Sequence, residues 1–388
     1  MAGTTLGVGL IGYAFMGAAH SQAWRSAGHF FDLPLTARMT AICGRDRAAT
    51  EAAAVKLGWE SAETDWRALI ARDDIQLVDI CSTGDTHAEI AVAALAAGKH
   101  VLCEKPLANT VAEAERMVAA ARAARVHGVR SMVGFNYRRV PAIALARRLV
   151  AEGRLGRIRH VRAQYLQDWI IDPQFPLVWR LQAERAGSGA LGDIGAHIVD
   201  ATQFIVGDTL AGVTGLTETF VKERPLVGSP SRTGPVTVDD AALFIGRFTG
   251  GALGSFEATR FAGGRKNSIR IEVNGSLGSL AFDFEAMNEL HLFDGTAGPE
   301  TGGFTRILVT EPEHPYLRAW WPAGHLLGYE HSFTHEIADL LTHLANGTDP
   351  EPSFEDGLQV QQVLAAVAES AAAGSHWREL PAATRNAA

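Results

Sequence analysis

The sequence has few of the residues on which metal-binding or disulfide-stabilised folds depend. Its 388 residues include three cysteines, Cys43, Cys81 and Cys103, and no C-x-x-C pair. This spacing provides neither a zinc-ligand pattern nor a disulfide framework. Each cysteine ends an apolar run, so we expect three small, buried side chains and no metal site. A cytoplasmic, reducing location is the expected compartment.

Positive charge and long apolar runs are also scarce. The chain has 43 acidic and 35 basic residues, a formal net charge of -8. Nucleic-acid binders and polybasic membrane-binding segments concentrate positive charge, so we expect neither partner. No stretch approaches the ~18 apolar residues of a membrane span. The apolar N-terminus lacks the basic segment of a signal peptide.

The first third of the chain alternates between two patterns. Helical patterns follow the first glycine-rich loop and occupy Arg47–Leu57, Asp65–Ala71, His87–Ala97 and Val111–Arg125. Strand-like apolar runs between them are Leu6–Ile11, Met39–Cys43, Leu77–Cys81, Val101–Cys103 and Met132–Phe135. This alternation predicts a doubly wound, parallel Rossmann sheet over residues 1–136, which binds ligands at the carboxyl ends of its strands.

A glycine-rich loop follows the first strand. Gly12 and Gly17 fill the first and third positions of G-x-G-x-x-G, and Ala14 replaces the second. The first glycine makes the turn, the third packs helix against strand, and the helix N-terminus binds phosphate. We therefore expect a dinucleotide to bind here, with a purely structural tight turn as the alternative. The residues assigned to it are Gly12, Ala14, Phe15, Met16 and Gly17.

The end of the second predicted strand bears on the choice between NAD and NADP. An acidic side chain there binds the ribose hydroxyls of NAD, whereas an arginine accommodates the 2′-phosphate of NADP. Gly44 stands at the acidic position, followed by Arg45 and Asp46. We assign all three to the cofactor site and expect NAD, with NADP as the alternative.

After Arg139 the pattern changes. A helix at Pro141–Ala151 precedes strand-like runs without intervening helices, and two helices at Glu330–Ala345 and Phe354–Ala373 follow them. The runs are Ile158–Gln167, Leu216–Val221, Ala241–Phe248, Gly254–Phe261, Ser268–Asn274, Leu280–Phe284 and Glu289–Phe293. This predicts an α+β domain over residues 137–388 with a large, open, mostly antiparallel sheet.

Longer motifs connect the chain to a known family. They are IGYAFMG at 11–17, GKHVLCEKPLA at 98–108, GFNYRR at 134–139, GSGALGDIGAHIVD at 187–200, IEVNGSLGSL at 271–280 and PSFEDG at 352–357. With them the chain resembles the Gfo/Idh/MocA oxidoreductases of the glucose–fructose oxidoreductase and inositol dehydrogenase type. The opening GYAFMGAAHSQA, with QDW at 167–169 and VWR at 178–180, is most similar to the sugar and anhydrosugar branch, of the levoglucosan dehydrogenase kind.

The resemblance implies catalytic roles for three residues. Lys105, one of only five lysines, would stabilise the oxygen of a secondary alcohol, and His197 would accept its proton. Asp193 lies four residues before His197, on the same face of a helix, and would orient the imidazole. The alternatives are a solvated surface position for Lys105 and a helix N-cap for Asp193.

The resemblance also implies binding residues and an assembly. Members often carry Thr-Pro-Asn where this chain has Ser82-Thr83-Gly84, so Gly84 supplies no side-chain amide to the cofactor. Further cofactor contacts are expected from Ser82, Thr83, His87, Glu104, Lys105 and Asn136. The sugar pocket is expected to contain Tyr137, Gln167, Trp169, Trp179, Arg180, Asp193 and His197. A homodimer or homotetramer is expected to form through the C-terminal sheet.

Together these patterns predict an NAD(P)-dependent dehydrogenase. It would transfer a hydride between the nicotinamide and a secondary hydroxyl of a sugar, anhydrosugar or cyclic polyol. One alternative is a redox-neutral, NAD-dependent enzyme in which transient oxidation of a ring hydroxyl permits glycoside cleavage by elimination. The other is a catalytically silent regulatory protein that senses the nucleotide.

Overall fold

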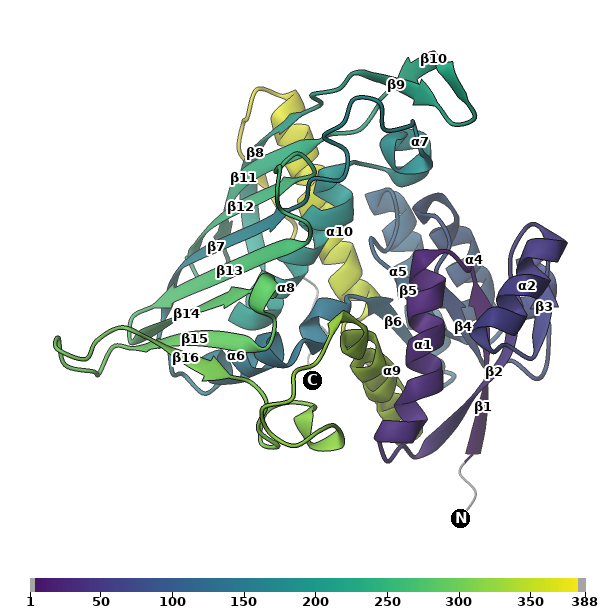
Figure 1. The fold of residues 1–388 in the computed structure, drawn as a ribbon, viewed down its shortest axis with the longest axis horizontal. Helices are drawn as coiled ribbons and strands as arrows, with labels where there is room; N and C mark the ends of the chain where they lie inside the picture. Colours follow the sequence, from purple (N-terminus) through teal and green to yellow (C-terminus); the bar gives the residue numbers. More distant parts are fainter. Residues whose placement is uncertain (1–3, 383–388) are drawn as a thin grey trace. The chain divides into compact units, whose positions relative to one another are not determined.

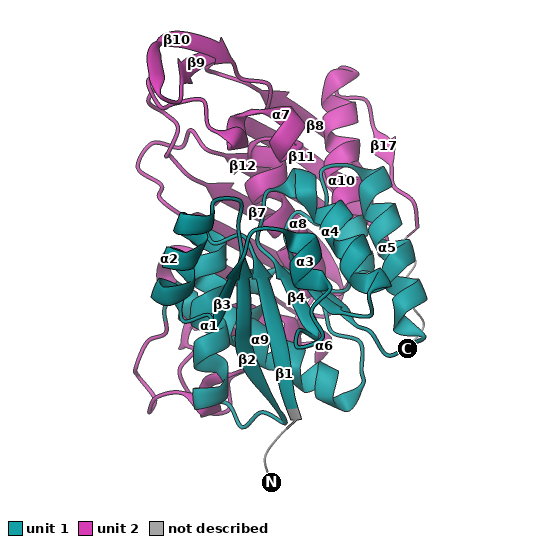
Figure 2. Cartoon of the chain, turned by 90° about the vertical axis from the view of Figure 1, so that its right-hand side faces the viewer, with its two compact units in different colours: residues 1–139, 328–358 teal, residues 140–327, 359–388 magenta. Residues whose placement is uncertain are grey.

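The computed structural model describes residues 4–382, which form two compact units (Figure 2). Unit 1 contains the described residues up to Arg139 together with Gly328–Leu358. Unit 2 contains Val140–Leu327 and the described residues from Gln359 onward. No described helix combines the length and the apolar character needed to span a bilayer.

Unit 1 is built on a six-stranded parallel sheet with the order β3-β2-β1-β4-β5-β6. The strands are β1 (Thr4–Ile11), β2 (Leu35–Cys43), β3 (Ser61–Glu63), β4 (Leu77–Ile80), β5 (His100–Glu104) and β6 (Ser131–Gly134). The helices between them are α1 (Phe15–Phe30), α2 (Arg47–Leu57), α3 (Trp66–Ile70), α4 (Gly84–Ala96) and α5 (Val111–Arg125). The strand order reverses between β1 and β4, which places the expected ligand position at the loops that follow them.

The predicted parallel sheet is confirmed, with one addition. The five expected strands are those whose apolar runs are buried, and all three cysteines are free and buried as predicted. The short strand β3 has the sequence Ser-Ala-Glu and pairs with the end of β2. It carries no apolar run, so the sequence pattern gives no signal for it.

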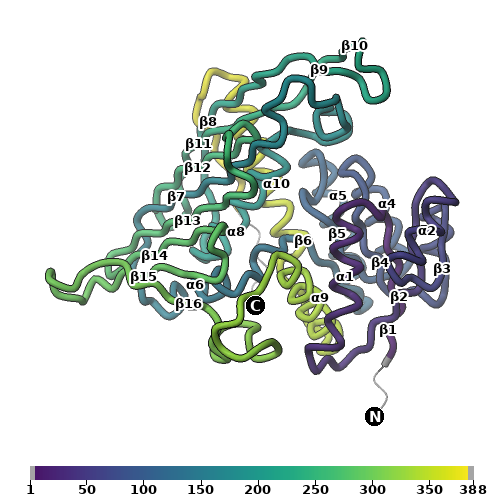
Figure 3. Tube along the Cα trace, viewed as in Figure 1, coloured from purple at the N-terminus to yellow at the C-terminus, as the bar shows by residue number. Residues whose placement is uncertain are grey.

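Helix α9 (Tyr329–Asn346) belongs to unit 1, although it comes late in the chain. It packs along α1, and Figure 3 shows the two helices side by side. The apolar side chains of Phe333, Ile337 and Leu340 join the core cluster that contains Trp24 and Leu10. The sequence analysis places this segment in residues 137–388, whereas this apolar packing makes it part of the first compact unit.

Unit 2 contains a nine-stranded sheet with the order β16-β15-β14-β13-β7-β12-β11-β8-β17 (Figure 1). The strands are β7 (Ile158–Leu166), β8 (Leu210–Glu218), β11 (Ala241–Phe248), β12 (Leu253–Thr259), β13 (Ser268–Gly275), β14 (Gly278–Asp283), β15 (Glu289–Asp294), β16 (Phe304–Leu308) and β17 (Arg378–Glu379). Within the described chain β7 and β12 pair in parallel and the other neighbours are antiparallel. The predicted open, mostly antiparallel sheet is confirmed.

Helices cover one face of this sheet. Helix α6 (Pro141–Ala151) packs on β14 and β15, and α8 (Ala196–Val206) packs on β7 and β13. The remaining elements are the short helices η1 (Asn136–Arg139, in unit 1), η2 (Trp179–Leu181), α7 (Ala183–Ala186), η3 (Leu191–Gly195), η4 (Phe284–Ala286) and η5 (Leu317–Ala319), the hairpin β9 (Glu223–Leu226) and β10 (Ser229–Pro235), and the long helix α10 (Phe354–Ala372).

The other face of the sheet carries exposed apolar side chains. Alternation along β11 buries Phe244 and turns Leu243 and Ile245 outward, where each is more than half exposed. Leu216 of β8 lies opposite Leu243 in the ladder and is also exposed. These outward residues of β7, β8, β11 and β12 line a shallow groove, which we call the outer groove.

Candidate active site

The loop between β1 and α1 is shaped for a dinucleotide. Gly12 has φ +95°, and its backbone N–H donates to the Cys43 carbonyl at 2.9 Å. A Cβ on Gly17 would lie 2.0 Å from the Gly12 oxygen, so this position requires glycine. The N-cap, Ala14, makes no side-chain cap, and the first turn of α1 has no acidic residue. The first N–H groups of α1 therefore face an anion without a competing carboxylate, which fits the pyrophosphate of NAD.

The structure at the end of β2 explains why position 44 has no acidic residue. A Cβ at Gly44 would lie 2.0 Å from Cε1 of Tyr13, so the tyrosine ring fills the space that a side chain at 44 would need. Asp46 accepts a hydrogen bond from the Ala49 N–H at 2.8 Å and caps α2, while Arg45 is exposed. The Asp46 carboxylate is therefore fixed at this edge of the sheet, one residue beyond the exposed arginine.

His87 joins the loops that follow β4 and β5. Its Nε2 lies 3.1 Å from the Ser82 carbonyl oxygen and its Nδ1 lies 3.1 Å from the Pro106 carbonyl oxygen. The ring is buried, and this burial lowers its pKa. The expected contact of His87 with cofactor stays a prediction, since the structure shows the ring bonded to the backbone of both loops.

The position of Gly84 is filled by another side chain. A Cβ on Gly84 would lie 2.4 Å from Oδ1 of Asn109, so this asparagine occupies the adjoining space. Ser82 and Thr86 are linked through their hydroxyl oxygens at 2.7 Å. An amide is thus present beside the segment 82–84, contributed by a residue that the sequence analysis did not select.

The Glu104-Lys105-Pro106 segment leaves β5 with a cis bond before the proline. The Lys105 N–H donates to Oε2 of Glu104 at 3.1 Å, and the Glu104 carboxylate is buried. Lys105 itself is partly exposed. The motif therefore presents lysine at the ligand edge of the sheet and directs the glutamate into the core of unit 1.

Tyr329, at the start of α9, is a second residue that sequence reasoning missed. Its ring stacks with Phe15 of the glycine-rich loop at 6.3 Å and lies 6.3 Å from the ring of Tyr137. Burial raises the pKa of Tyr329, so its hydroxyl stays protonated. Nearby, the buried Asn136 donates its amide to Ser332 Oγ at 2.8 Å. Unit 1 thus brings the predicted loop residues, Asn136 and Tyr137 close to α9.

In unit 2, Asp193 lies in the π-helical turn η3, directly before α8. The alternative role of helix cap is wrong, because Asp239 takes that place and accepts the Gly189 and Leu191 N–H groups at 2.7 Å each. Asp193 instead pairs with Arg260, with Nη2 and Oδ2 2.8 Å apart. A π-helical turn inside a helix frequently marks a functional site.

Arg260 connects this carboxylate to the expected sugar residues. Its guanidinium is 1% exposed and lies 5.2 Å from the centre of the Trp169 ring. It also donates to the carbonyls of Gly189 at 3.1 Å and Arg180 at 3.4 Å. No sequence motif singles out Arg260, because a single arginine at the end of a strand is common.

A chain of polar contacts leads from Trp169 to His197. The Trp169 indole N–H donates to Gln167 Oε1 at 2.9 Å, and Gln167 donates to Asn267 Oδ1 at 3.0 Å. Tyr165 donates to the same oxygen at 2.5 Å, and its ring lies 5.9 Å from that of the buried His197. Unit 2 therefore brings together four predicted residues, Gln167, Trp169, Asp193 and His197, and adds Tyr165, Arg260 and Asn267.

Of the three remaining predicted pocket residues, Tyr137 belongs to unit 1, and Trp179 and Arg180 lie beside this group in unit 2. The Arg180 guanidinium stacks over the Trp179 ring at 4.4 Å, and the Arg180 carbonyl is the one that Arg260 contacts. Indole faces, amides and a guanidinium suit a small, neutral, hydroxyl-rich ligand. The unit 2 residues thus have the chemistry of a sugar site.

Comparison with known proteins gives the same assignment. The model described as "Oxidoreductase family, NAD-binding Rossmann fold" matches residues 6–135, and the GFO/IDH/MocA C-terminal domain matches residues 143–281. Levoglucosan dehydrogenase of Pseudarthrobacter phenanthrenivorans is 42% identical over 97% of this chain and 98% of its own.

Solved structures agree over the same length. An oxidoreductase domain protein from Kribbella flavida is 70% identical, with a TM-score of 0.95 over 98% of this chain and 100% of its own. A levoglucosan dehydrogenase in complex with NADH and levoglucosan is 42% identical, with a TM-score of 0.93 over 97% of this chain and 100% of its own. The chain therefore belongs to the Gfo/Idh/MocA family of oxidoreductases, whose N-terminal domain is an NAD-binding Rossmann fold.

Proposed function

We propose that this protein is an NAD-dependent dehydrogenase that oxidises a secondary hydroxyl of a sugar, with anhydrosugars such as levoglucosan as the first candidates, or catalyses the reverse reduction. The polar and aromatic group around Asp193 and His197 carries the proposal, since it combines a base with partners for a hydroxyl-rich ligand. The 42% identity to levoglucosan dehydrogenase supports the anhydrosugar, and inositol dehydrogenases among the relatives extend the class to cyclic polyols.

NAD, when bound, accepts the hydride. The loop residues Gly12, Ala14, Phe15, Met16 and Gly17 would hold its pyrophosphate, and Gly44, Arg45 and Asp46 would adjoin the adenosine ribose. Contacts toward the nicotinamide end are assigned to Ser82, Thr83, His87, Glu104, Lys105 and Asn136. We propose a preference for NAD over NADP because the fixed Asp46 carboxylate repels a 2′-phosphate, with Arg45 acting in the opposite direction.

Three side chains take part in removing the proton of the substrate hydroxyl. His197 accepts the proton of the substrate hydroxyl, and Nζ of Lys105 stabilises the negative charge that develops on its oxygen. Asp193, itself held by Arg260, orients the imidazole. Tyr137, Gln167, Trp169, Trp179 and Arg180 bind the remaining hydroxyls and ring surface of the sugar.

The test is a substrate screen with purified protein. Levoglucosan, common hexoses and inositols are offered with NAD or NADP, and reduction is followed by nicotinamide absorbance, with Lys105→Met as the inactive control. We expect net reduction of NAD by at least one anhydrosugar or sugar, and a higher kcat/KM with NAD than with NADP. Glycoside cleavage without net reduction would instead establish the redox-neutral reaction, and nucleotide binding without any turnover would establish the regulatory role.

We also propose that the protein forms a homodimer or homotetramer through the outer groove in unit 2. The support is the row of outward Leu216, Leu243 and Ile245 side chains on adjacent strands, since monomeric proteins rarely expose contiguous apolar patches. A cytoplasmic location is supported by the three free thiols. The domain boundary near residue 136 and the lack of nucleic-acid and membrane partners stay predictions.

A further inference from the structure

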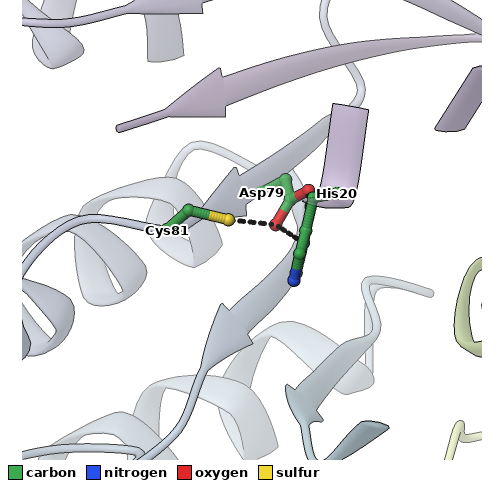
Figure 4. Close-up of side chains that lie close together, drawn as sticks. All are labelled: His20, Asp79 and Cys81. Atoms are coloured by element: carbon green, nitrogen blue, oxygen red, sulfur yellow. Dashed lines mark hydrogen bonds and ion pairs between the residues drawn. The ribbon is translucent and has the colours of Figure 1, made fainter. Parts of the chain in front are cut away.

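Unit 1 contains a buried charged cluster that the proposed reaction does not use directly. It consists of His20 on α1, Asp79 on β4 and Glu104 at the end of β5, and each of the three is at most 3% exposed. Figure 4 shows the His20 ring directed at the Asp79 carboxylate, with the Cys81 thiol on its other side. Burying several ionisable groups together is costly, so this arrangement calls for a specific role.

The hydrogen bonds determine the charge of the imidazole. Nδ1 lies 2.9 Å from Oδ2 of Asp79, and Nε2 lies 3.0 Å from Oε1 of Glu104. Asp79 also accepts the Trp24 indole N–H at 2.7 Å, and the second oxygen of Glu104 accepts the Lys105 backbone N–H at 3.1 Å. Each oxygen of the two carboxyl groups thus has a hydrogen-bond partner, and each ring nitrogen of His20 faces a carboxyl oxygen. An imidazolium donates through both nitrogens and bonds both carboxyl groups at once, so this geometry favours the protonated form of His20.

We propose that His20 is a positioning residue, an imidazolium that clamps Glu104 and through it fixes the backbone of Lys105. The contacts form a continuous path from Asp79 through the imidazolium and the Glu104 carboxylate to the lysine N–H. The proposal rests on the role assigned to Lys105, whose charge must meet the substrate oxygen within a fraction of an ångström.

The groups around the ring agree with this assignment. Burial alone would lower the pKa of His20, but the charge and hydrogen bond of Asp79 hold it well above its ordinary value. Glu336 on α9 is buried, and desolvation raises its pKa to about 8, so it is mostly neutral at pH 7. Tyr329 and Cys81 also keep their protons, because burial raises the pKa of each. Asp79 and Glu104 are then the two acidic side chains whose oxygens contact the ring nitrogens.

A metal ion is a poorer occupant of the same cluster. One ligand atom each from His20, Asp79 and Cys81 lies within 4.8 Å of the others, which is compatible with metal ligation. The thiol, however, would have to ionise against a pKa raised by burial and by the adjacent Asp79 charge. The imidazole and carboxylate atoms are also bonded to one another, so metal binding would break the path to Lys105.

The kinetic test compares His20→Gln with His335→Gln. His335 is an equally buried histidine of unit 1, and its Nδ1 lies 2.9 Å from the Arg139 carbonyl oxygen. We expect His20→Gln to lower kcat about 10- to 100-fold, as small displacements of catalytic groups do, with NAD affinity within about threefold of wild type. His335→Gln should keep kcat within about twofold. Wild-type kcat in His20→Gln would overturn the proposal.

Asp79→Asn provides a second variant that retains the imidazole. Removing the carboxylate charge lowers the imidazole pKa, so activity should decline toward alkaline conditions at a lower pH than in wild type. A role confined to stability would lower the melting temperature and leave the pH profile of kcat unchanged. An unchanged profile would therefore contradict the proposal, including when His20→Gln fails to fold.

A spectroscopic test of His20 does not depend on whether the protein oxidises a sugar. In the wild-type protein labelled with ¹⁵N-histidine, the signal assigned by its loss in His20→Gln should show protons on both ring nitrogens at neutral pH. A singly protonated ring would overturn the proposal whether or not a sugar is oxidised. If no sugar is oxidised but the ring is doubly protonated, the clamp stands and the dehydrogenase assignment fails.

Discussion

His197 and Lys105 have complementary tasks, so substituting each one gives a distinct test of the mechanism. His197→Ala should lower kcat by roughly 10²–10⁴ with NAD binding nearly intact, because proton transfer loses its base. Lys105→Ala should lower kcat comparably, since the developing alkoxide loses its cation. Steady-state kinetics and calorimetric NAD titration measure both effects. Oxidation by the wild type should also rise from acidic to neutral pH as the imidazole loses its proton.

The double variant provides the control for a shared task. Its loss should be much smaller than the product of the two single losses, because residues that act as a unit are not additive. If His197→Ala retained wild-type turnover and its pH profile, His197 would be structural and Lys105 would become the candidate base.

A second prediction about a single residue concerns Arg260. Arg260→Met should raise KM for the sugar and lower kcat, together by about tenfold or more, because Asp193 loses a charge-assisted partner. NAD affinity should not change. The matched control is Arg270→Met, which removes an exposed pair with Asp283 at 2.9 Å and should leave kinetics unaltered. Equal kinetics in the two variants would remove Arg260 from the site.

Sequence reasoning found the residues that belong to motifs and missed those that reach the site through space. Lys105 and His197 stand in specific patterns, and the glycine spacing indicates the loop directly. Arg260 and Asn267 in unit 2 and Tyr329 in unit 1 have no such pattern, because each reaches the predicted residues of its own unit through strand pairing or helix packing. The acidic position at 44 shows the same limit, since only the structure reveals that the Tyr13 ring occupies its space.

At the scale of elements, α9 combines an apolar stripe with one buried acid. Glu336 lies between Phe333 and Ile337 of the core, and desolvation raises its pKa from the ordinary 4.5 to about 8. The folded protein therefore keeps a proton that the unfolded chain releases. The contribution of Glu336 to the free energy of unfolding is therefore fully present below about pH 4.5 and is lost as the pH rises toward about 8.

Glu336→Gln should remove this contribution to the pH dependence, because the amide does not titrate. The free energy of unfolding of the variant, relative to wild type, should increase by on the order of 1 kcal/mol per pH unit across that window. Urea unfolding of the variant and of wild type at about pH 5.5 and about pH 8 measures the difference. The same relative stability at both pH values would mean that the carboxyl is not buried as described.

The elements differ in how clearly the sequence pattern predicts them. The β-α series is predicted because strands such as β4 are fully buried and, apart from Asp79, consist of apolar residues. Strand β8 begins at Leu210, whereas the expected strand was Leu216–Val221, which is wrong at both ends. Gly212 and Gly215 weaken its pattern, and they are glycines because Trp377 and Phe244 pack against them. Tertiary contact, rather than local preference, sets these bounds.

At the scale of the whole molecule, the outer groove predicts self-association. Ile245→Lys should reduce the molar mass measured by light scattering to that of one chain, because a charge in an apolar contact is left without a partner. Val126→Lys, a change at an exposed apolar residue of unit 1, should leave the mass unaltered. A wild-type protein of one-chain mass would contradict the proposed assembly.

Unit 1 consists of two stretches of chain that leave the ribosome at very different times. The strands β1–β6 emerge early, whereas Gly328–Leu358 follows after the central sheet of unit 2. Until α9 is synthesised, the core cluster around Trp24 and Ala27 lacks the side chains of Phe333, Ile337, Leu340 and Leu341. The nascent dinucleotide domain therefore cannot complete its apolar core until late in translation. A stop codon that precedes the codons of α9 would therefore disrupt the fold of unit 1, although the strands of unit 1 are synthesised first.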